Sequence, residues 1–193
     1  MSQKYFKHKL YVKKGLDIAF TSETLEKIQS IISHYPDGQQ KSALIPLLHI
    51  AQEEFGGSLN VDIMDYVAEL LQITPIEVYE VATFYSQFYI DPVGKYVIEV
   101  CQTGPCSICG GDEIIAYLEE KLQIKVGETT ADNLFSLKAV ECLGACGSAP
   151  VLQVNTEFHE FLDLHKIDEI IADLRSKKDV KKPEELTWKE RLS

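Results

Sequence analysis

The chain has 193 residues and a formal net charge of −11, and its acidic side chains are concentrated between residues 15 and 175, where acids outnumber lysines and arginines about threefold. Because such an acidic body repels nucleic-acid phosphates, we expect no nucleic-acid ligand. No apolar run approaches the roughly 20 residues that cross a bilayer, and the N-terminus lacks an apolar signal core, so we expect no direct membrane insertion and a cytoplasmic location.

The N-terminal half of the chain has the pattern of a small helical domain. Residues 1–20 show no clean periodicity, and we expect an extended arm there. Apolar residues recur at helical spacing from Ser22, from Ser42 and from Val61. Thr74-Pro75-Ile76-Glu77 is a capping box with proline at the first helical position, which predicts the start of a fourth helix. We therefore predict a four-helix bundle over residues 21–91.

The succession of short helices has a helix-turn-helix rhythm, but its charge excludes DNA binding. Residues 41–91 contain one lysine, no arginine and eight acids. A DNA-binding surface needs clustered basic side chains to neutralise phosphates. The phenylalanines and tyrosines between Tyr79 and Tyr89 are therefore expected in the core and in packing between domains.

A second domain is expected after the turn cluster Asp91-Pro92-Val93-Gly94. Sequence patterns predict strands at 96–100, 134–140, 151–154 and 158–162, and helices at 113–122 and 166–175. This order, with a proline directly before the third strand, predicts a thioredoxin-like α/β layer over residues 92–175 and an α+β chain as a whole. The polar tail 176–193 is expected to order on a partner, with Leu186 and Trp188 as anchors.

All five cysteines lie in two glycine-bearing loops of this second domain. They are Cys101, Cys106, Cys109, Cys142 and Cys146. Their odd number argues against a disulfide framework. Thiolates are soft ligands, so the two loops predict an iron–sulfur or zinc site, or a thiol redox site.

The cysteine spacing has three interpretations. Cys101-x4-Cys106-x2-Cys109 with one distant cysteine matches the plant-type ferredoxin pattern. Cys106-Ser-Ile-Cys109 alone resembles a thioredoxin-type dithiol. The third interpretation pairs Cys101-x4-Cys106 with Cys142-x3-Cys146, and it is favoured because only it employs both Cys142 and Cys146. Cys109, close to the next helix start, is then expected to lie away from the site.

The third interpretation favours a [2Fe–2S] cluster over the alternatives. Structural zinc could use the same four thiolates, although its ligand pairs are more often separated by two residues on at least one side. Thiol redox chemistry and five inert cysteines remain open. The histidines outside the cysteine loops are not expected to be ligands; these include His34, His49, His159 and His165.

Several stretches resemble the thioredoxin-like [2Fe–2S] ferredoxin family. These stretches are Cys101-x3-Pro-Cys106, Glu141-Cys-Leu-Gly-Ala-Cys146, Ala149-Pro150 and Lys125-Val-Gly-Glu-Thr-Thr130. Two upstream blocks, residues 42–52 and 73–85, add a likeness to the small iron–sulfur subunits of the NADH dehydrogenase module of respiratory complex I. The resemblance extends over about residues 20–175.

The resemblance implies one [2Fe–2S] cluster bound by Cys101, Cys106, Cys142 and Cys146. It also implies a partner subunit that binds FMN and NADH, further peripheral-arm subunits, and a place at the inner face of the plasma membrane. No glycine-rich dinucleotide fingerprint occurs in this chain. We therefore expect an electron-transfer subunit of NADH:quinone oxidoreductase with no catalytic site of its own. The acidic body predicts a low reduction potential.

Two other functions stay open at this point. The same fold could serve an NAD-linked hydrogenase or a formate dehydrogenase. A function of a different class is a thiol–disulfide oxidoreductase that uses Cys106 and Cys109.

Overall fold

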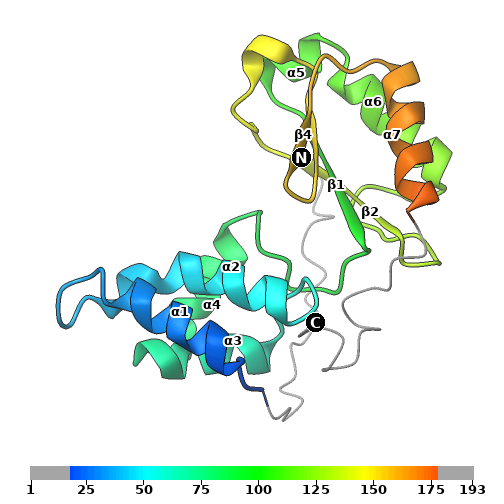
Figure 1. Cartoon of the computed structure of the whole chain (residues 1–193). Coiled ribbons are helices and arrows are strands. Elements are labelled where there is room, and N and C mark those ends of the chain that lie inside the picture. Colours follow the sequence, from blue (N-terminus) through cyan, green and yellow to red (C-terminus); the bar gives the residue numbers. More distant parts are fainter. Residues whose placement is uncertain (1–17, 178–193) are drawn as a thin grey trace. The chain divides into compact units, whose positions relative to one another are not determined.

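The computed structural model describes residues 18–177. The chain divides into two compact units between Pro92 and Val93 (Figure 1). Nearly all of the expected N-terminal arm and of the C-terminal tail, including Leu186 and Trp188, lies outside the described residues.

The first unit contains the helices α1 (Ser22–Ile32), α2 (Leu44–Glu54), α3 (Val61–Leu71) and α4 (Pro75–Phe84). Two of them begin at short polar caps, as helix N-termini require. The Thr21 hydroxyl accepts the Thr24 N–H at 3.1 Å, and the Asn60 side chain accepts the Ile63 N–H at 3.0 Å. The predicted start of α3 at Val61 is confirmed.

The capping box predicted at the start of α4 is confirmed. The Glu77 carboxylate accepts hydrogen bonds from the Thr74 backbone N–H at 2.9 Å and from its hydroxyl at 2.8 Å, and Pro75 is the first helical residue. Lys41 donates to the same carboxylate at 2.7 Å. This contact ties α4 to the short segment that precedes α2.

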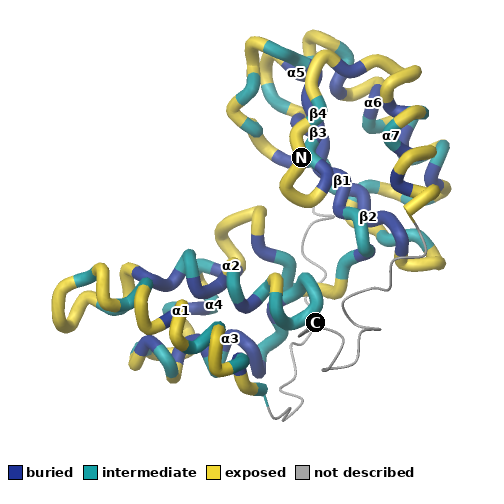
Figure 2. The backbone as a smooth tube through the Cα atoms, in the orientation of Figure 1, coloured by how far each residue is buried: buried dark blue, intermediate teal, exposed yellow. Residues whose placement is uncertain are grey.

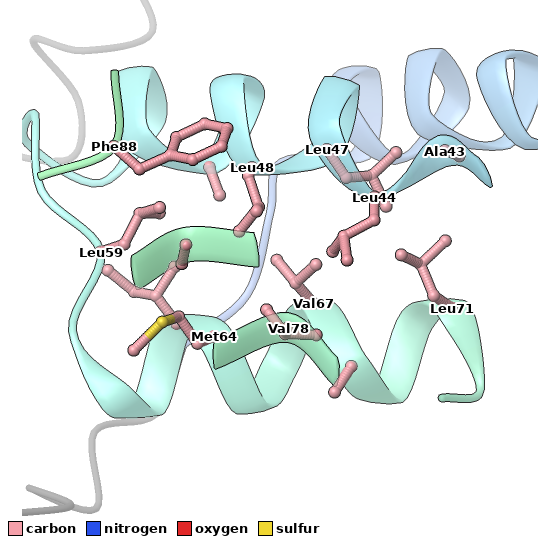
Figure 3. Close-up of a cluster of buried hydrophobic side chains, with 14 of the residues drawn as sticks. Ala43, Leu44, Leu47, Leu48, Leu59, Met64, Val67, Leu71, Val78 and Phe88 are labelled. Carbon is pink, nitrogen blue, oxygen red and sulfur yellow. The ribbon is translucent and has the colours of Figure 1, made fainter. Parts of the chain in front are cut away.

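Apolar side chains from all four helices meet in one core, and Figure 3 shows part of it. Figure 2 colours the backbone by burial and shows that buried and exposed stretches alternate along these helices. The fully buried members of this core include Ile28, Leu47, Leu48, Leu59, Val67, Leu71 and Val78.

Two expectations for the first unit need correction. The second helix does not begin at Ser42, because residues Gln40–Ala43 form a 3-10 turn (η2) and the α-helix starts at Leu44. Among the aromatic residues, Phe88 is buried in the core as expected, but Phe84 is 79% exposed. Phe84 is the last residue of α4, and the side of this helix that is buried in the core is the one that carries Val78 and Ala82.

The second unit is built on a four-stranded sheet of order β2-β1-β3-β4. Its strands are β1 (Tyr96–Cys101), β2 (Phe135–Val140), β3 (Leu152–Val154) and β4 (Glu157–His159). Strands β1 and β2 are parallel, and the other pairs are antiparallel. This confirms a thioredoxin-like order of elements, with β1 in the interior of the sheet.

Helix α6 (Gly111–Leu122) packs against β1 and β2, and α7 (Leu164–Ser176) lies beside α6 (Figure 1). Asp168 of α7 joins the two helices, because it accepts hydrogen bonds from Tyr117 and Lys121 of α6. The core beneath them contains Leu118, Phe135, Leu137, Leu152 and Ile171. None of the helices between residues 18 and 177 has the length and apolar content to cross a bilayer.

Several details of the second unit differ from expectation, among them the start of α6, which lies at Gly111 rather than at Glu113. A short helix, α5 (Gly104–Ile108), contains Cys106 and ends directly before Cys109, where a loop was expected. Strand β4 ends at His159 rather than at Leu162. Helix α7 begins at Leu164 rather than at Lys166, since the Asp163 side chain caps it by accepting the Lys166 N–H at 2.8 Å.

Candidate metal centre

The two cysteine loops leave the same edge of the sheet. Cys101 is the last residue of β1 and stands opposite Val140, the last residue of the parallel strand β2. Cys142 follows two residues later. Because the carboxyl ends of parallel neighbours meet at one edge, the two loops start side by side.

The first thiol pair is buried. Cys101 and Cys106 are each 2% exposed. The Cys106 N–H donates to the Thr103 carbonyl at 2.9 Å, which folds the chain back after β1 and begins α5. The Thr103 hydroxyl lies 3.5 Å from the Cys101 sulfur.

The two buried thiols differ in proton affinity. Burial raises the pKa of Cys106 to about 11, and the neighbouring Cys101 thiol adds to this. Burial acts in the same direction on Cys101, but the Thr103 hydroxyl and backbone interactions with Thr103 and Leu143 outweigh it, so the pKa of Cys101 lies below its usual value. The surroundings of Cys101 therefore favour a thiolate.

The second pair, Cys142 and Cys146, is exposed, and its sulfur atoms are 3.8 Å apart. Two thiolates bound to one tetrahedral metal ion at about 2.3 Å each have their sulfurs about 3.8 Å apart. The Gly144 N–H donates to the Cys142 sulfur at 3.3 Å. The hydrogen bond with Cys142 raises the pKa of Cys146. This pair already has the spacing of two ligands on one ion.

The second loop packs directly on the first pair. Cys101, Cys106 and Val151 form a small buried cluster, and three partly buried residues of the second loop pack against it: Leu143, Ala145 and Ala149. The Cys101 N–H also donates to the Val151 carbonyl at 3.2 Å. The Ala149–Pro150 peptide bond that leads into this contact is cis. The two thiol pairs are thus held on facing loops.

The two pairs also interact electrostatically. The charge of Cys146 contributes to the raised pKa of Cys106, and the charge of Cys101 contributes to the raised pKa of Cys146. Cys109 is exposed and is the C-cap residue that follows α5. Within residues 18–177, no three His, Cys, Asp or Glu side chains converge closely enough to hold a single metal ion. The thiols are arranged as two pairs.

Two pairs of thiolates fit a two-iron cluster, because a [2Fe–2S] cluster is held by four cysteines. The small residues Gly144, Ala145 and Gly147 stand beside the second pair, and the Gly144 N–H donates to the Cys142 sulfur, which suits a group whose sulfurs accept hydrogen bonds. The residues present therefore fit the group that the sequence predicts.

One residue that positions the site is not identified by the sequence pattern. A β-carbon on Gly111 would lie 2.8 Å from the Cys106 carbonyl oxygen and 3.0 Å from that of Cys101. The glycine pair after Cys109 is visible in the sequence, but by itself it indicates only the end of a loop. The close approach of α6 to both buried cysteines explains why a glycine stands there.

The comparisons with known proteins agree with this geometry. The family model of the thioredoxin-like [2Fe–2S] ferredoxins matches residues 28–175. The chain belongs to this family. As a thioredoxin-like ferredoxin it has the mixed helices and four-stranded sheet described above.

Curated relatives of this ferredoxin carry names from respiratory complexes. The E subunit of the NADH-quinone oxidoreductase of Rickettsia typhi is 46% identical over 153 residues, which are 79% of this chain and 90% of the relative. The mitochondrial NADH dehydrogenase [ubiquinone] flavoprotein 2 of Dictyostelium discoideum is 42% identical over 162 residues, which are 84% of this chain and 66% of the relative.

A solved structure shares the fold. The NAD+-reducing [NiFe]-hydrogenase in its air-oxidized state matches with a TM-score of 0.61 and 23% sequence identity. The match covers 70% of this ferredoxin and 23% of that hydrogenase chain. At this identity the likeness concerns the fold alone.

Proposed function

We propose that the chain is the one-electron carrier subunit of an NADH:quinone oxidoreductase and binds one [2Fe–2S] cluster. The observation that carries the proposal is the pair of facing loops that bring two thiol pairs together at one edge of the sheet. The names of the curated relatives supply the type of complex.

Cys101 and Cys106 would hold one iron, and Cys142 and Cys146 the other. When bound, the cluster supplies reversible one-electron transfer. The chain contributes the surroundings: Val151 and Leu143 keep water from the buried pair, and the Gly144 N–H donates toward the exposed pair. The exposed pair is the side from which a second redox centre can approach.

The other parts of the proposal concern the complex. We assign residues 21–91 to a four-helix bundle and residues 92–175 to the cluster domain, with an arm before and a tail after them. FMN and NADH would bind to a partner subunit, and this chain would have no catalytic site of its own. Other peripheral-arm subunits would place the complex at the cytoplasmic face of the plasma membrane.

The thiol–disulfide alternative is disfavoured by the position of its two thiols. In a reactive dithiol the attacking cysteine is accessible and has a lowered pKa. Here Cys106 is 2% exposed, and burial raises its pKa to about 11. Cys109, the second member of that dithiol, is the exposed one. The first thiol therefore lacks both properties of a nucleophile.

The complex is tested by isolating the affinity-tagged chain from its own cells and identifying what accompanies it. The proposal predicts an assembly that contains FMN, oxidises NADH and reduces a quinone. An assembly that instead oxidises hydrogen or formate with NAD+ would assign the chain to one of the other NAD-linked complexes. Isolation of the chain alone, with dithiol activity lost in Cys109→Ser, would overturn the proposal.

A further inference from the structure

Thr103 contacts both members of the buried thiol pair. It lies two residues after Cys101 and immediately before α5. Its hydroxyl is 3.5 Å from the Cys101 sulfur, and its carbonyl accepts the Cys106 N–H at 2.9 Å. Thr103 thus contacts the side chain of Cys101 and the backbone of Cys106.

The Thr103 hydroxyl is not used to cap the helix it precedes. Threonine at a helix N-cap ordinarily accepts a hydrogen bond from the backbone N–H two or three residues later. Thr103 occupies the N-cap position of α5 with extended backbone angles, yet its side chain makes no capping hydrogen bond. The hydroxyl lies instead at the Cys101 sulfur. Local helix formation therefore does not explain its orientation.

The direction of this hydrogen bond is determined once Cys101 binds a metal ion. A free thiol and a hydroxyl can each donate to the other. A metal-bound thiolate has no hydrogen, so the hydroxyl must then be the donor. A hydrogen bond donated to a ligand sulfur withdraws negative charge from the site, and this favours the more negatively charged, reduced state.

We propose that Thr103 is a positioning residue that raises the reduction potential of the site by donating its hydroxyl hydrogen to the Cys101 sulfur. The inference rests on the proposed function, because it requires Cys101 to be a cluster ligand. This effect is opposite in direction to the lowering of the potential that is expected from the acidic body. Thr103 acts through Cys101 and binds no iron itself.

The test compares three variants of the full-length, cluster-loaded chain by redox titration monitored by electron paramagnetic resonance. Thr103→Val removes the hydroxyl and keeps a β-branched side chain, whereas Thr103→Ser keeps the hydroxyl. Ser107→Ala is the matched control, because it removes a hydroxyl of α5 that donates to Asp112 at 2.9 Å and not to a thiol.

We expect the valine variant to shift the reduction equilibrium toward the oxidised state by roughly tenfold, which is about 59 mV for a one-electron couple. The serine variant and Ser107→Ala should keep the potential of the unchanged protein. A valine variant with full iron and sulfide content and an unchanged potential would overturn the inference. So would a serine variant whose potential falls as far as that of the valine variant.

Thr103→Ala gives a second route if the valine variant loses its cluster, because it removes the same hydroxyl without adding a methyl group. The alanine variant must then show the lower potential. Loss of the cluster from both variants, with retention in Thr103→Ser, would assign the hydroxyl to holding Cys101 in place and would contradict a tuning role. If the unchanged protein itself holds no iron and sulfide, the proposed function fails and not this inference alone.

Discussion

The carbonyl oxygen of Cys106 lies 2.8 Å from the position that a β-carbon on Gly111 would occupy. The Cys101 carbonyl oxygen is 3.0 Å from the same point. Both contacts are to backbone, which cannot move aside as a flexible side chain can. The first turn of α6 is therefore packed against the buried thiol pair, and this relationship makes the position of both thiols depend on one glycine.

Replacing this glycine should disturb the thiols before it disturbs the rest of the fold. We expect Gly111→Ala to lower the iron and sulfide content strongly and to destabilise the second unit by about 1–3 kcal/mol, the usual range for overpacking. Metal analysis and thermal unfolding measure the two effects.

Gly147→Ala is the control, because Gly147 is the neighbour of Cys146 but a β-carbon there meets no atom within 4 Å. It should retain the cluster. Equal iron loss in both glycine variants would show that the close approach at Gly111 is not what positions the pair.

The four proposed ligands should differ sharply from the fifth cysteine. Serine in place of Cys101, Cys106, Cys142 or Cys146 removes a thiolate ligand, and we expect iron affinity to fall by more than the ~10–100-fold typical of residues that only support a ligand. Cys109→Ser should leave the visible absorption and the iron content unchanged, because Cys109 is exposed at the end of α5 and lies outside the buried cluster of Cys101, Cys106 and Val151. Loss of colour in that variant would favour the plant-type ligand set instead.

The capping box should contribute measurably to the stability of the first unit. Thr74→Ala removes the hydroxyl that bonds the Glu77 carboxylate at 2.8 Å and the cap of α4. Loss of such a cap costs about 1 kcal/mol. Urea unfolding followed by circular dichroism should show this decrease, and an unchanged midpoint would mean that α4 does not depend on its cap. Thr83→Ala is a suitable comparison, since that exposed hydroxyl bonds only carbonyls within α4.

The same carboxylate predicts how the first unit responds to acid. The side-chain hydrogen bond from Lys41, followed by hydrogen bonds from Thr74, lowers the pKa of Glu77 from 4.5 to about 2. A group whose pKa is lowered in the folded state stabilises the fold above its unfolded pKa and loses this effect as pH falls through the folded value. The contribution should therefore be complete above pH 4.5 and disappear toward pH 2.

Carboxyl NMR titration of Glu77 tests this directly. In Lys41→Met the titration midpoint should move up toward 4.5, because the strongest of the interactions that lower the pKa is gone. A midpoint near 4.5 in the unchanged protein would show that the Lys41 contact does not persist in solution.

Elements with strong local signals were predictable from the sequence. The start of α3 at Val61 follows from the apolar residues that recur at helical spacing from there. The start of α4 follows from the capping box at Thr74. In these places local propensity and the fold agree.

Other features depend on tertiary contacts that no local pattern encodes. The five residues of α5 are too few to show a helical period, and they begin with Gly104 and Pro105. The requirement for glycine at position 111 arises because the start of α6 lies close to the carbonyl oxygens of Cys101 and Cys106. The exposure of Phe84 runs against its apolar character, because α4 buries only its opposite side.

The central claim is that two facing thiol pairs hold a two-iron cluster, and electron paramagnetic resonance on anaerobically purified protein tests it most directly. Spectra are recorded before and after reduction with dithionite, and iron, sulfide and zinc are counted on the same sample. We predict a brown protein that gives no electron paramagnetic resonance signal as purified and gains one spin-half signal on reduction. It should contain two irons and two sulfides per chain, as a [2Fe–2S] cluster requires. A colourless protein that contains zinc, shows no signal and takes up no cluster on reconstitution would contradict the account.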